Sequence, residues 1–325
     1  CINMIEAKAR ENASGFKIIR PLELGDWKEL PIGLEIPFEI VSHCPAHRDT
    51  PLGAVAVLAD ENGAARIRIG CCPSYGYLGY IDRPTSGWMK QFYLSGMWDG
   101  GEGGKKARRI SSIRSGKTEG APNDSIRLVS RLSIDAGRPV CEIGCGYGES
   151  LAYLERLGFK KLVGTEASPH RARVASEILQ VPIHVAPFED LNQAALGAHA
   201  PFALIFAHHV LEHVSDPHAV LTRSAALQTE GDYLVFSVPN AVAEPSMTIL
   251  TYLPHLHSFT FEAMARLFEL YGYEIVAKSA DWRVVTVAGR RVAKSVVAAR
   301  EVGRSPALAG RPAPQMRQKL IRGLG

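Results

Sequence analysis

The stretch that decides the fold is residues 140–148, VCEIGCGYG, a short and mostly apolar strand that runs into a turn with three glycines. Glycine at alternate positions lets the backbone adopt positive φ and lets a ligand approach without meeting a Cβ atom. Residues 149–157 then place three leucines at helical spacing before Gly158. A strand, a glycine turn and a helix in this order present free backbone N–H groups to a nucleotide-like ligand.

A second acidic residue, Glu166, follows the next apolar run at residues 161–165. Its offset from Glu142 suits a carboxylate at the tip of the second strand of a doubly wound sheet, where it would accept hydrogen bonds from ribose hydroxyls. The glycines are spaced G-x-G-x-G, whereas dinucleotide-binding turns have G-x-G-x-x-G. The spacing therefore favours a different nucleotide-like cofactor.

The form E-x-G-x-G-x-G, from Glu142 to Gly148, resembles motif I of class I S-adenosylmethionine-dependent methyltransferases. The resemblance extends over residues 138–288. Residues 202–217 contain LEH followed by Asp-Pro, residues 231–240 end in Pro-Asn, and residues 257–276 are similar to the H-x-F-T and G-F/Y ending of the subfamily that acts on small molecules. The resemblance implies an α/β fold with a Rossmann-like, doubly wound methyltransferase sheet, a closing antiparallel strand, and S-adenosylmethionine as cofactor.

The apolar runs predict seven strands for this sheet. They are residues 139–143, 161–165, 182–186, 202–207 and 232–238, then a closing antiparallel pair at residues 273–278 and 283–288. Ser168 and Pro169 predict the cap and first position of the helix after the second strand. Parallel strands place the loops that bind ligands at the carboxyl edge of the sheet.

Residues 1–103 lack this alternation of strands and helices and predict a small β-rich domain. Two alternating runs, residues 53–58 and 64–69, predict a β-hairpin between the knuckles HCPAH at residues 43–47 and CCPSYG at residues 71–76. The arrangement resembles the zinc ribbon that precedes many small-molecule methyltransferases, in which C-x-x-C occurs twice.

The four ligand positions of this ribbon hold Cys44, His47, Cys72 and Tyr75. A structural zinc site takes four nitrogen or sulfur ligands, and Tyr75 supplies neither. The sequence therefore predicts a degenerate ribbon and no bound metal.

Charge defines the remaining boundaries. We expect a basic linker and helical lead-in at residues 104–137, the core at residues 138–288 and a basic extension at residues 289–325. Residues 288–325 hold nine lysines or arginines and one acid, a pattern that also occurs in nucleic-acid contacts. The prolines and the absence of aromatic residues there favour a solvated extension, so we expect no nucleic-acid partner.

Residues 1–20 contain no signal-peptide core, and no apolar run reaches the length of a membrane span. The expected location is therefore cytoplasmic, without a membrane partner. The sequence does not predict the oligomeric state.

The resemblance also assigns the cofactor-binding residues. The glycine turn would pack against the methionine part of the cofactor, with Glu142 ordering the turn or contacting the amino group. Glu166 would take the ribose hydroxyls, Ala167 would lie under the adenine, and Phe188 and Glu189 would contact its edge. The full predicted set is Glu142, Gly144, Gly146, Gly148, Glu166, Ala167, Phe188, Glu189 and His208.

Three histidines are candidate general bases, because methyl transfer to a hydroxyl requires loss of its proton near neutrality. They are His209, after the fourth strand, and His255 and His257, in the loop after the fifth. Glu212 and His213 recur in relatives of differing chemistry, so a helix-stabilising or loop-ordering role is expected for both.

The sequence thus predicts an enzyme that transfers a methyl group from S-adenosylmethionine to a small polar acceptor such as a sugar, sugar nucleotide or secondary metabolite. Three alternatives stay open. They are a nucleic-acid methyltransferase that uses the basic tail, a non-catalytic cofactor-binding scaffold, and a nicotinamide oxidoreductase with a similar glycine turn.

Overall fold

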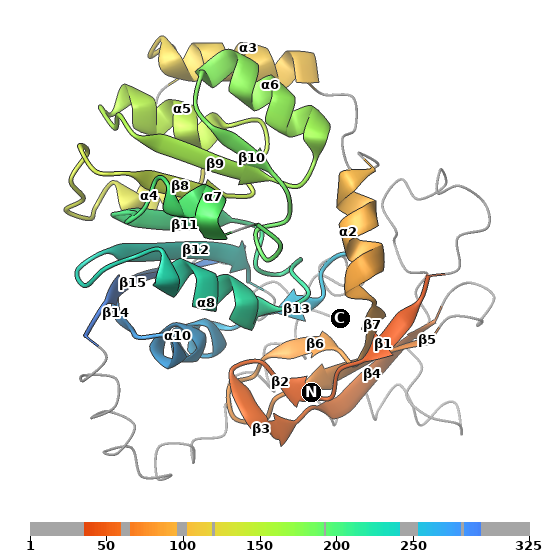
Figure 1. The fold of residues 1–325 in the computed structure, drawn as a ribbon. Helices are drawn as coiled ribbons and strands as arrows, with labels where there is room; N and C mark the ends of the chain where they lie inside the picture. Colours follow the sequence, from red (N-terminus) through yellow and green to blue (C-terminus); the bar gives the residue numbers. More distant parts are fainter. Residues whose placement is uncertain are drawn as a thin grey trace.

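The structure is a computed structural model that describes residues 36–59, 66–95, 103–118, 121–191, 193–240, 253–280 and 283–293. Figure 1 shows a large α/β unit and a smaller β-rich unit that contains the first strands of the chain. Within the described residues, no helix combines the length and the apolarity needed to cross a membrane. The basic extension lies outside the described residues from residue 294 onward.

The large unit is built on a seven-stranded sheet of order β10-β9-β8-β11-β12-β15-β14. Its strands are β8 (Val140–Ile143), β9 (Leu162–Glu166), β10 (Ile183–Val185), β11 (Leu204–His208), β12 (Tyr233–Pro239), β14 (Tyr273–Ala280) and β15 (Val284–Arg291). The first five pair in parallel, and β15 lies antiparallel between β12 and β14. The prediction of a doubly wound methyltransferase sheet closed by an antiparallel strand is confirmed, with each strand within two or three residues of its expected bounds.

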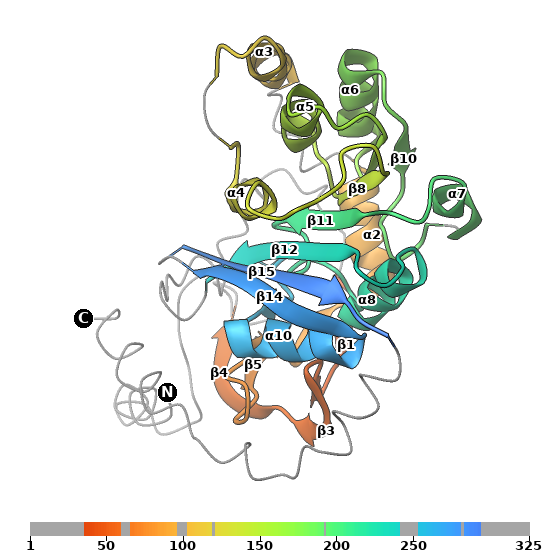
Figure 2. The same cartoon turned by 90° about the vertical axis from the view of Figure 1, so that its left-hand side faces the viewer.

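Two hydrophobic cores cover the two faces of this sheet. Successive residues of one strand enter different cores, because strand side chains alternate between faces: Ile205 packs into one core, and Leu204 and Phe206 pack into the other. The second core is covered by α3 (Gly103–Arg114), α4 (Asp124–Val129), α5 (Glu149–Arg156) and α6 (Pro169–Leu179). The first is covered by α8 (Pro217–Ala226) and α10 (Phe261–Leu270), which Figure 2 shows away from α3, α5 and α6; the short α7 (Gln193–Gly197) precedes β11.

Local sequence explains the helix that follows β9. Ser168 accepts a hydrogen bond from the Arg171 backbone N–H, and Pro169 occupies the first turn, as predicted. The segment predicted as a linker also packs on the core. Ile110 and Ile113 of α3 are fully buried against α5 and α6. The lead-in is thus part of the packed unit.

The β-rich unit has a four-stranded sheet of order β13-β6-β5-β4. Its members are β4 (Gly53–Ala59), β5 (Arg66–Cys71), β6 (Leu78–Tyr80) and β13 (His257–Ser258). The first two are the predicted hairpin. Two smaller pairs complete the unit, β1 (Phe38–Ile40) with β7 (Asp82–Pro84) and β2 (His43–Cys44) with β3 (His47–Pro51), and α2 (Ser86–Leu94) follows.

One strand of this small sheet comes from the region predicted as core. β13 pairs with β6, with His257 opposite Gly79. The Tyr77 hydroxyl donates to Nδ1 of His257 at 2.5 Å, and the His257 ring stacks on Phe259 at 5.3 Å between centroids. The two units therefore share a strand and a buried hydrogen bond. The predicted domain boundary at residue 103 does not account for this connection.

The two knuckles of the ribbon meet in the structure. The Cys44 and Cys72 side chains are 1% and 0% exposed. The Cys72 sulfur accepts hydrogen bonds from the Cys44 thiol and from the backbone N–H groups of Tyr75 and Ser74. These hydrogen bonds lower the pKa of Cys72 to about 6. The Tyr75 ring lies edge-on to His47, at 5.8 Å between centroids. The expectation that this ribbon holds no metal stays a prediction.

Candidate functional site

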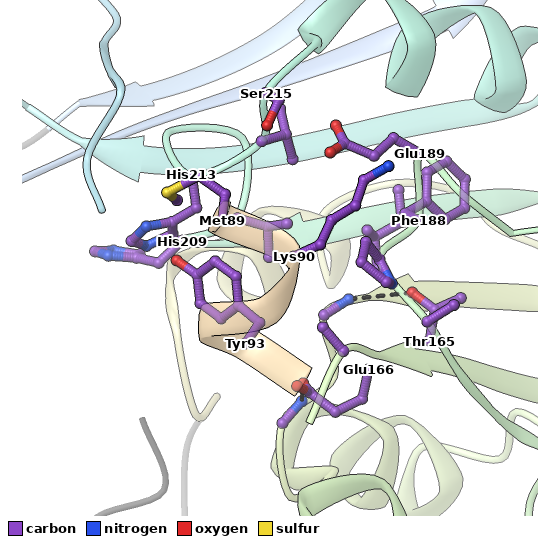
Figure 3. A pocket seen from close by; sticks show the side chains of 18 of the residues that line it. Met89, Lys90, Tyr93, Thr165, Glu166, Phe188, Glu189, His209, His213 and Ser215 are labelled. Atoms are coloured by element: carbon purple, nitrogen blue, oxygen red, sulfur yellow. Dashed lines mark hydrogen bonds between the residues drawn. The ribbon is translucent and has the colours of Figure 1, made fainter. Parts of the chain in front are cut away.

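A cavity of about 290 Å³ opens at the carboxyl edge of the parallel strands, between the glycine turn and α2. Figure 3 shows its walls. Seven of the predicted cofactor-binding residues line it: Gly144, Gly146, Glu166, Ala167, Phe188, Glu189 and His208. The edge of the sheet that the sequence pattern identified is therefore also the edge that holds the cavity.

The glycine turn adopts the backbone that its composition predicts. Gly144 and Gly146 have φ of +64° and +56°, a region that residues with a Cβ rarely adopt. A Cβ at Gly144 would lie 2.6 Å from Cγ2 of Val210, whereas a Cβ at Gly146 would meet no atom within 4 Å. The backbone at Gly146 thus faces open space in the cavity, where a ligand can approach it closely.

Glu166 holds this turn from the end of β9. One carboxylate oxygen accepts the Gly146 backbone N–H at 2.8 Å and the other accepts the Ser168 backbone N–H at 2.8 Å. The side chain is 8% exposed and lines the cavity. A carboxylate fixed in this way at the cavity wall can also accept hydrogen bonds from hydroxyl donors of a ligand.

Glu142 and Gly148, both predicted to bind the cofactor, do not line the cavity. Glu142 is 3% exposed beneath the turn and accepts hydrogen bonds from the Ser150 side chain and the Leu151 backbone, while burial raises its pKa well above the ordinary value. Gly148 caps α5 at φ of +89°, where a Cβ would lie 2.4 Å from Leu179. Both residues support the turn from the side away from the cavity. We therefore withdraw the prediction that they contact the ligand directly.

The third loop contributes Phe188 and Glu189. Phe188 is 4% exposed. One Glu189 oxygen accepts the Asp216 backbone N–H at 3.2 Å, and burial raises the pKa of this carboxyl. The loop after β10 is thereby joined to the start of α8.

A histidine cluster forms the other end of the cavity. His208 and His209 lie at the end of β11 with their rings 4.2 Å apart. Burial lowers the pKa of His208 to about 3 and also lowers the pKa of His209, so both rings are neutral near pH 7. The His209 side chain remains 37% exposed.

The backbone of His209 has φ of +54°, one of two positive values at residues other than glycine within the described ranges. Its N–H donates to the Ser237 carbonyl at 2.9 Å. Residues held in this sparsely populated region concentrate at functional sites. The strained position supports a role for His209 at the cavity.

The structure separates the three predicted bases. His209 lines the cavity. His255 does not line it, but its ring lies 4.7 Å from that of His213. His257 is 4% exposed, and both of its ring nitrogens are bonded, one to Tyr77 and the other to the Val214 carbonyl. A histidine with both nitrogens engaged cannot take a proton from an acceptor, so His257 is withdrawn as a base.

Two features of the site were not predicted. Met89, Lys90 and Tyr93 of α2 line the cavity from the small unit, and Lys90 pairs at 2.8 Å with Asp190, the residue after Glu189 of the cavity wall. Glu212 is 1% exposed, and burial raises its pKa to about 8. Residues 91–93 of α2 resemble a segment that follows the ribbon in related methyltransferases, but this resemblance did not place α2 at the cavity. Glu212 lies in the turn after β11, and only its burial distinguishes it from an ordinary exposed acid.

Known proteins agree with this geometry. Residues 118–278 match a family described as a methyltransferase domain. Trans-aconitate 2-methyltransferase from Azoarcus sp. (strain BH72) is 31% identical over 131 residues, 39% of this chain and 49% of that protein. Ubiquinone biosynthesis O-methyltransferase from Albidiferax ferrireducens is 30% identical over 118 residues, 35% of this chain and 46% of that protein.

The chain thus spans about half the length of the curated relatives it matches. Among solved structures, magnesium protoporphyrin IX methyltransferase from Synechocystis PCC 6803 aligns over 63% of this chain and 100% of that chain, with 16% identity and a TM-score of 0.44. The family match covers the glycine turn, Glu166 and the histidine cluster together. Residues 118–278 are therefore a class I S-adenosylmethionine-dependent methyltransferase domain.

Proposed function

We propose that this chain transfers a methyl group from S-adenosylmethionine to an oxygen atom of a small polar acceptor. The sequence favoured a sugar, a sugar nucleotide or a secondary metabolite. The relatives are named for trans-aconitate and for ubiquinone biosynthesis, which extends the acceptor class to other small oxygen-bearing molecules.

One observation carries this proposal: a single cavity joins the glycine turn and Glu166 at one end to His209 and Tyr93 at the other. The first end suits the ribose and methionine parts of the cofactor, because it offers a bare backbone and a fixed carboxylate. The second end offers a neutral histidine beside an aromatic side chain. A methyl donor and its acceptor would therefore meet within one enclosed space.

Methyl transfer is an in-line displacement, so the main task of the protein is to align the acceptor oxygen with the methyl carbon. The oxygen attacks that carbon, the carbon–sulfur bond breaks, and its electron pair stays on the sulfur of S-adenosylhomocysteine. The acceptor hydroxyl loses its proton in the same step. His209 is the residue we assign to accept it, because its ring lines the cavity and burial keeps it neutral.

Calorimetry with S-adenosylhomocysteine and with NAD tests the cofactor. We expect binding of the former with a micromolar or lower Kd and no binding of the latter; binding of NAD alone would overturn the proposal in favour of an oxidoreductase. Transfer of a labelled methyl group to a panel of hydroxy acids, phenols and sugars then tests catalysis. A protein that binds the cofactor but modifies none of these classes, and instead methylates nucleic acid, would overturn the acceptor class.

A further inference from the structure

Three side chains with metal-ligating atoms gather beside the histidine end of the cavity. Glu212, His213 and His255 each offer one ligand atom, and these atoms all lie within 4.8 Å of one another. Glu212 and His213 follow β11, whereas His255 arrives from the loop between β12 and β13. Two separate loops thus deliver one carboxylate and two imidazoles to the same place.

Within the described residues, neither oxygen of Glu212 accepts a hydrogen bond from another residue. Both oxygens are buried, and the residue is 1% exposed. Burying a carboxylate without a hydrogen bond raises the free energy of the folded protein, because the group loses its hydration and no protein donor replaces it. Such a group calls for an explanation, and a bound cation is one that the neighbouring residues support.

The orientation of His213 supplies that support. Its Nδ1 donates to the Pro254 carbonyl at 3.0 Å, so the neutral ring turns the lone pair of Nε2 toward Glu212 Oε1, 3.7 Å away. A proton or a metal cation between these two atoms would stabilise their close approach. A backbone carbonyl that fixes the second nitrogen is also the usual arrangement around histidines that ligate metals.

We propose that Glu212, His213 and His255 bind a divalent transition-metal cation of the zinc class. Two imidazole nitrogens and one carboxylate oxygen suit zinc or cobalt, whereas magnesium prefers oxygen ligands alone. Tetrahedral ligands at about 2.1 Å from the ion lie about 3.4 Å apart. The Glu212–His213 pair, at 3.7 Å, is close to this separation, and His255 would move toward the ion as it binds. The prediction of no metal concerned the ribbon, where Tyr75 replaces a ligand, and it did not consider Glu212 together with His255.

Three protein ligands leave a fourth position for water or a substrate atom. His213 lines the cavity, and Figure 3 shows it beside His209 and Tyr93. The open position therefore suits an oxygen of the acceptor. This step rests on the proposed methyl transfer, and it favours an acceptor whose reacting hydroxyl lies next to a second oxygen that can share the cation.

The cation would lower the pKa of the bound hydroxyl, and His209 would receive its proton. The resulting oxygen attacks the methyl carbon while the carbon–sulfur bond breaks with its electron pair on sulfur. The cation is neither oxidised nor reduced. The site thus adds a Lewis acid to the acceptor end without changing the cofactor end.

Titration of the full-length, chelator-treated protein with Zn²⁺ by calorimetry tests the site, with circular dichroism as a check on folding. We expect one tight site per chain in the unaltered protein. Glu212→Gln and His255→Ala should each weaken it at least tenfold. His199→Ala removes a histidine outside the cavity and should leave it unchanged, and Cys72→Ser, which alters the ribbon thiols, should leave it unchanged as well.

Co²⁺ separates the two possible locations spectroscopically. Binding through nitrogen and oxygen gives visible d–d bands without the intense thiolate-to-metal absorption that a ribbon site would show. Loss of the tight site in Cys72→Ser, or full binding by both Glu212→Gln and His255→Ala, would overturn the inference. If Glu212→Gln does not fold, His255→Ala alone decides, since His255 is only partly buried.

Measuring the affinity for S-adenosylhomocysteine in parallel distinguishes failure of the metal site from failure of the proposed function. Protein that binds S-adenosylhomocysteine but no Zn²⁺ contradicts the metal site alone. Protein that binds Zn²⁺ through these residues but no S-adenosylhomocysteine contradicts the proposed methyl transfer and leaves the metal site standing.

Discussion

The two ends of the cavity are built in different ways. The end that we assign to the cofactor comes from residues close in sequence, the turn at residues 144–148 and Glu166, whose carboxylate accepts two short backbone hydrogen bonds. The end that we assign to the acceptor combines α2, the loop after β11 and the loop before β13, and Glu212 lies beside it with neither oxygen bonded to another residue. A local motif can carry its own hydrogen bonds, whereas an assembled site leaves polar groups ready for a ligand.

The largest effect expected from this comparison concerns the acceptor end. His209→Ala should lower turnover by roughly 10²–10⁴, the usual contribution of a positioned general base, while the affinity for S-adenosylhomocysteine stays within a few fold. Steady-state kinetics and calorimetry measure the two quantities, and His199→Ala serves as the matched control. Near-normal turnover would mean that the acceptor is nucleophilic enough for alignment alone.

Next in size is the cofactor end. Glu166→Ala removes the carboxylate that orders Gly146 and the contacts expected with the ribose hydroxyls, each worth roughly 1.5–3 kcal/mol as a hydrogen bond to a charged group. The affinity for S-adenosylhomocysteine should fall at least tenfold. Glu177→Ala, an exposed acid on α6, should not change it. An unchanged affinity in folded Glu166→Ala would remove this residue from the site.

A smaller effect is expected at α2. Tyr93→Phe keeps the ring, which lines the cavity and lies edge-on to His213 at 6.0 Å between centroids, and removes the hydroxyl. We expect the KM for the acceptor to rise about fivefold, the size of one ordinary hydrogen bond of about 1 kcal/mol. The affinity for S-adenosylhomocysteine should be unaffected. If the variant weakens cofactor binding instead, α2 belongs to the cofactor end and the division of the cavity is wrong.

The last expected effect is on stability and leaves binding and turnover at the cavity unchanged. Tyr77→Phe removes the buried hydrogen bond to His257 that joins the two units, at a cost of about 1–3 kcal/mol when a buried partner is left unsatisfied. Chemical denaturation followed by fluorescence should show a lower midpoint in a single transition. Two separate transitions in the unaltered protein would show that the units unfold independently, contrary to the shared strand.

Much of the cofactor end could be predicted, because its residues are close in sequence and their types follow from backbone geometry. The turn needs glycine at Gly144 and Gly146, and the next strand brings Glu166 to the same edge. The prediction for Glu142 was less successful. An acid next to a glycine turn can face the ligand or the core, and only the packing around Ser150 shows that Glu142 faces the core.

The acceptor end could be predicted only in part. The position of His209 at the cavity could be predicted because it follows β11 directly, and its role as a base stays a prediction. His255 and His257 looked equivalent in the sequence, yet β13 pairing buries His257 against Tyr77 and leaves His255 beside His213. Two residues in one short segment point to different sides of a strand or turn, so their roles depend on register, which the sequence pattern did not establish.

The sequence by itself determined the sheet, the methyltransferase domain and the edge of the sheet that holds the cavity, because strand periodicity and glycine geometry are local properties. Only the tertiary structure decided which side chains complete the acceptor end. It brought α2 of the small unit over the cavity and placed His255 beside Glu212. Contacts between distant segments depend on how loops cross the packed core, and neither spacing nor composition specifies those crossings.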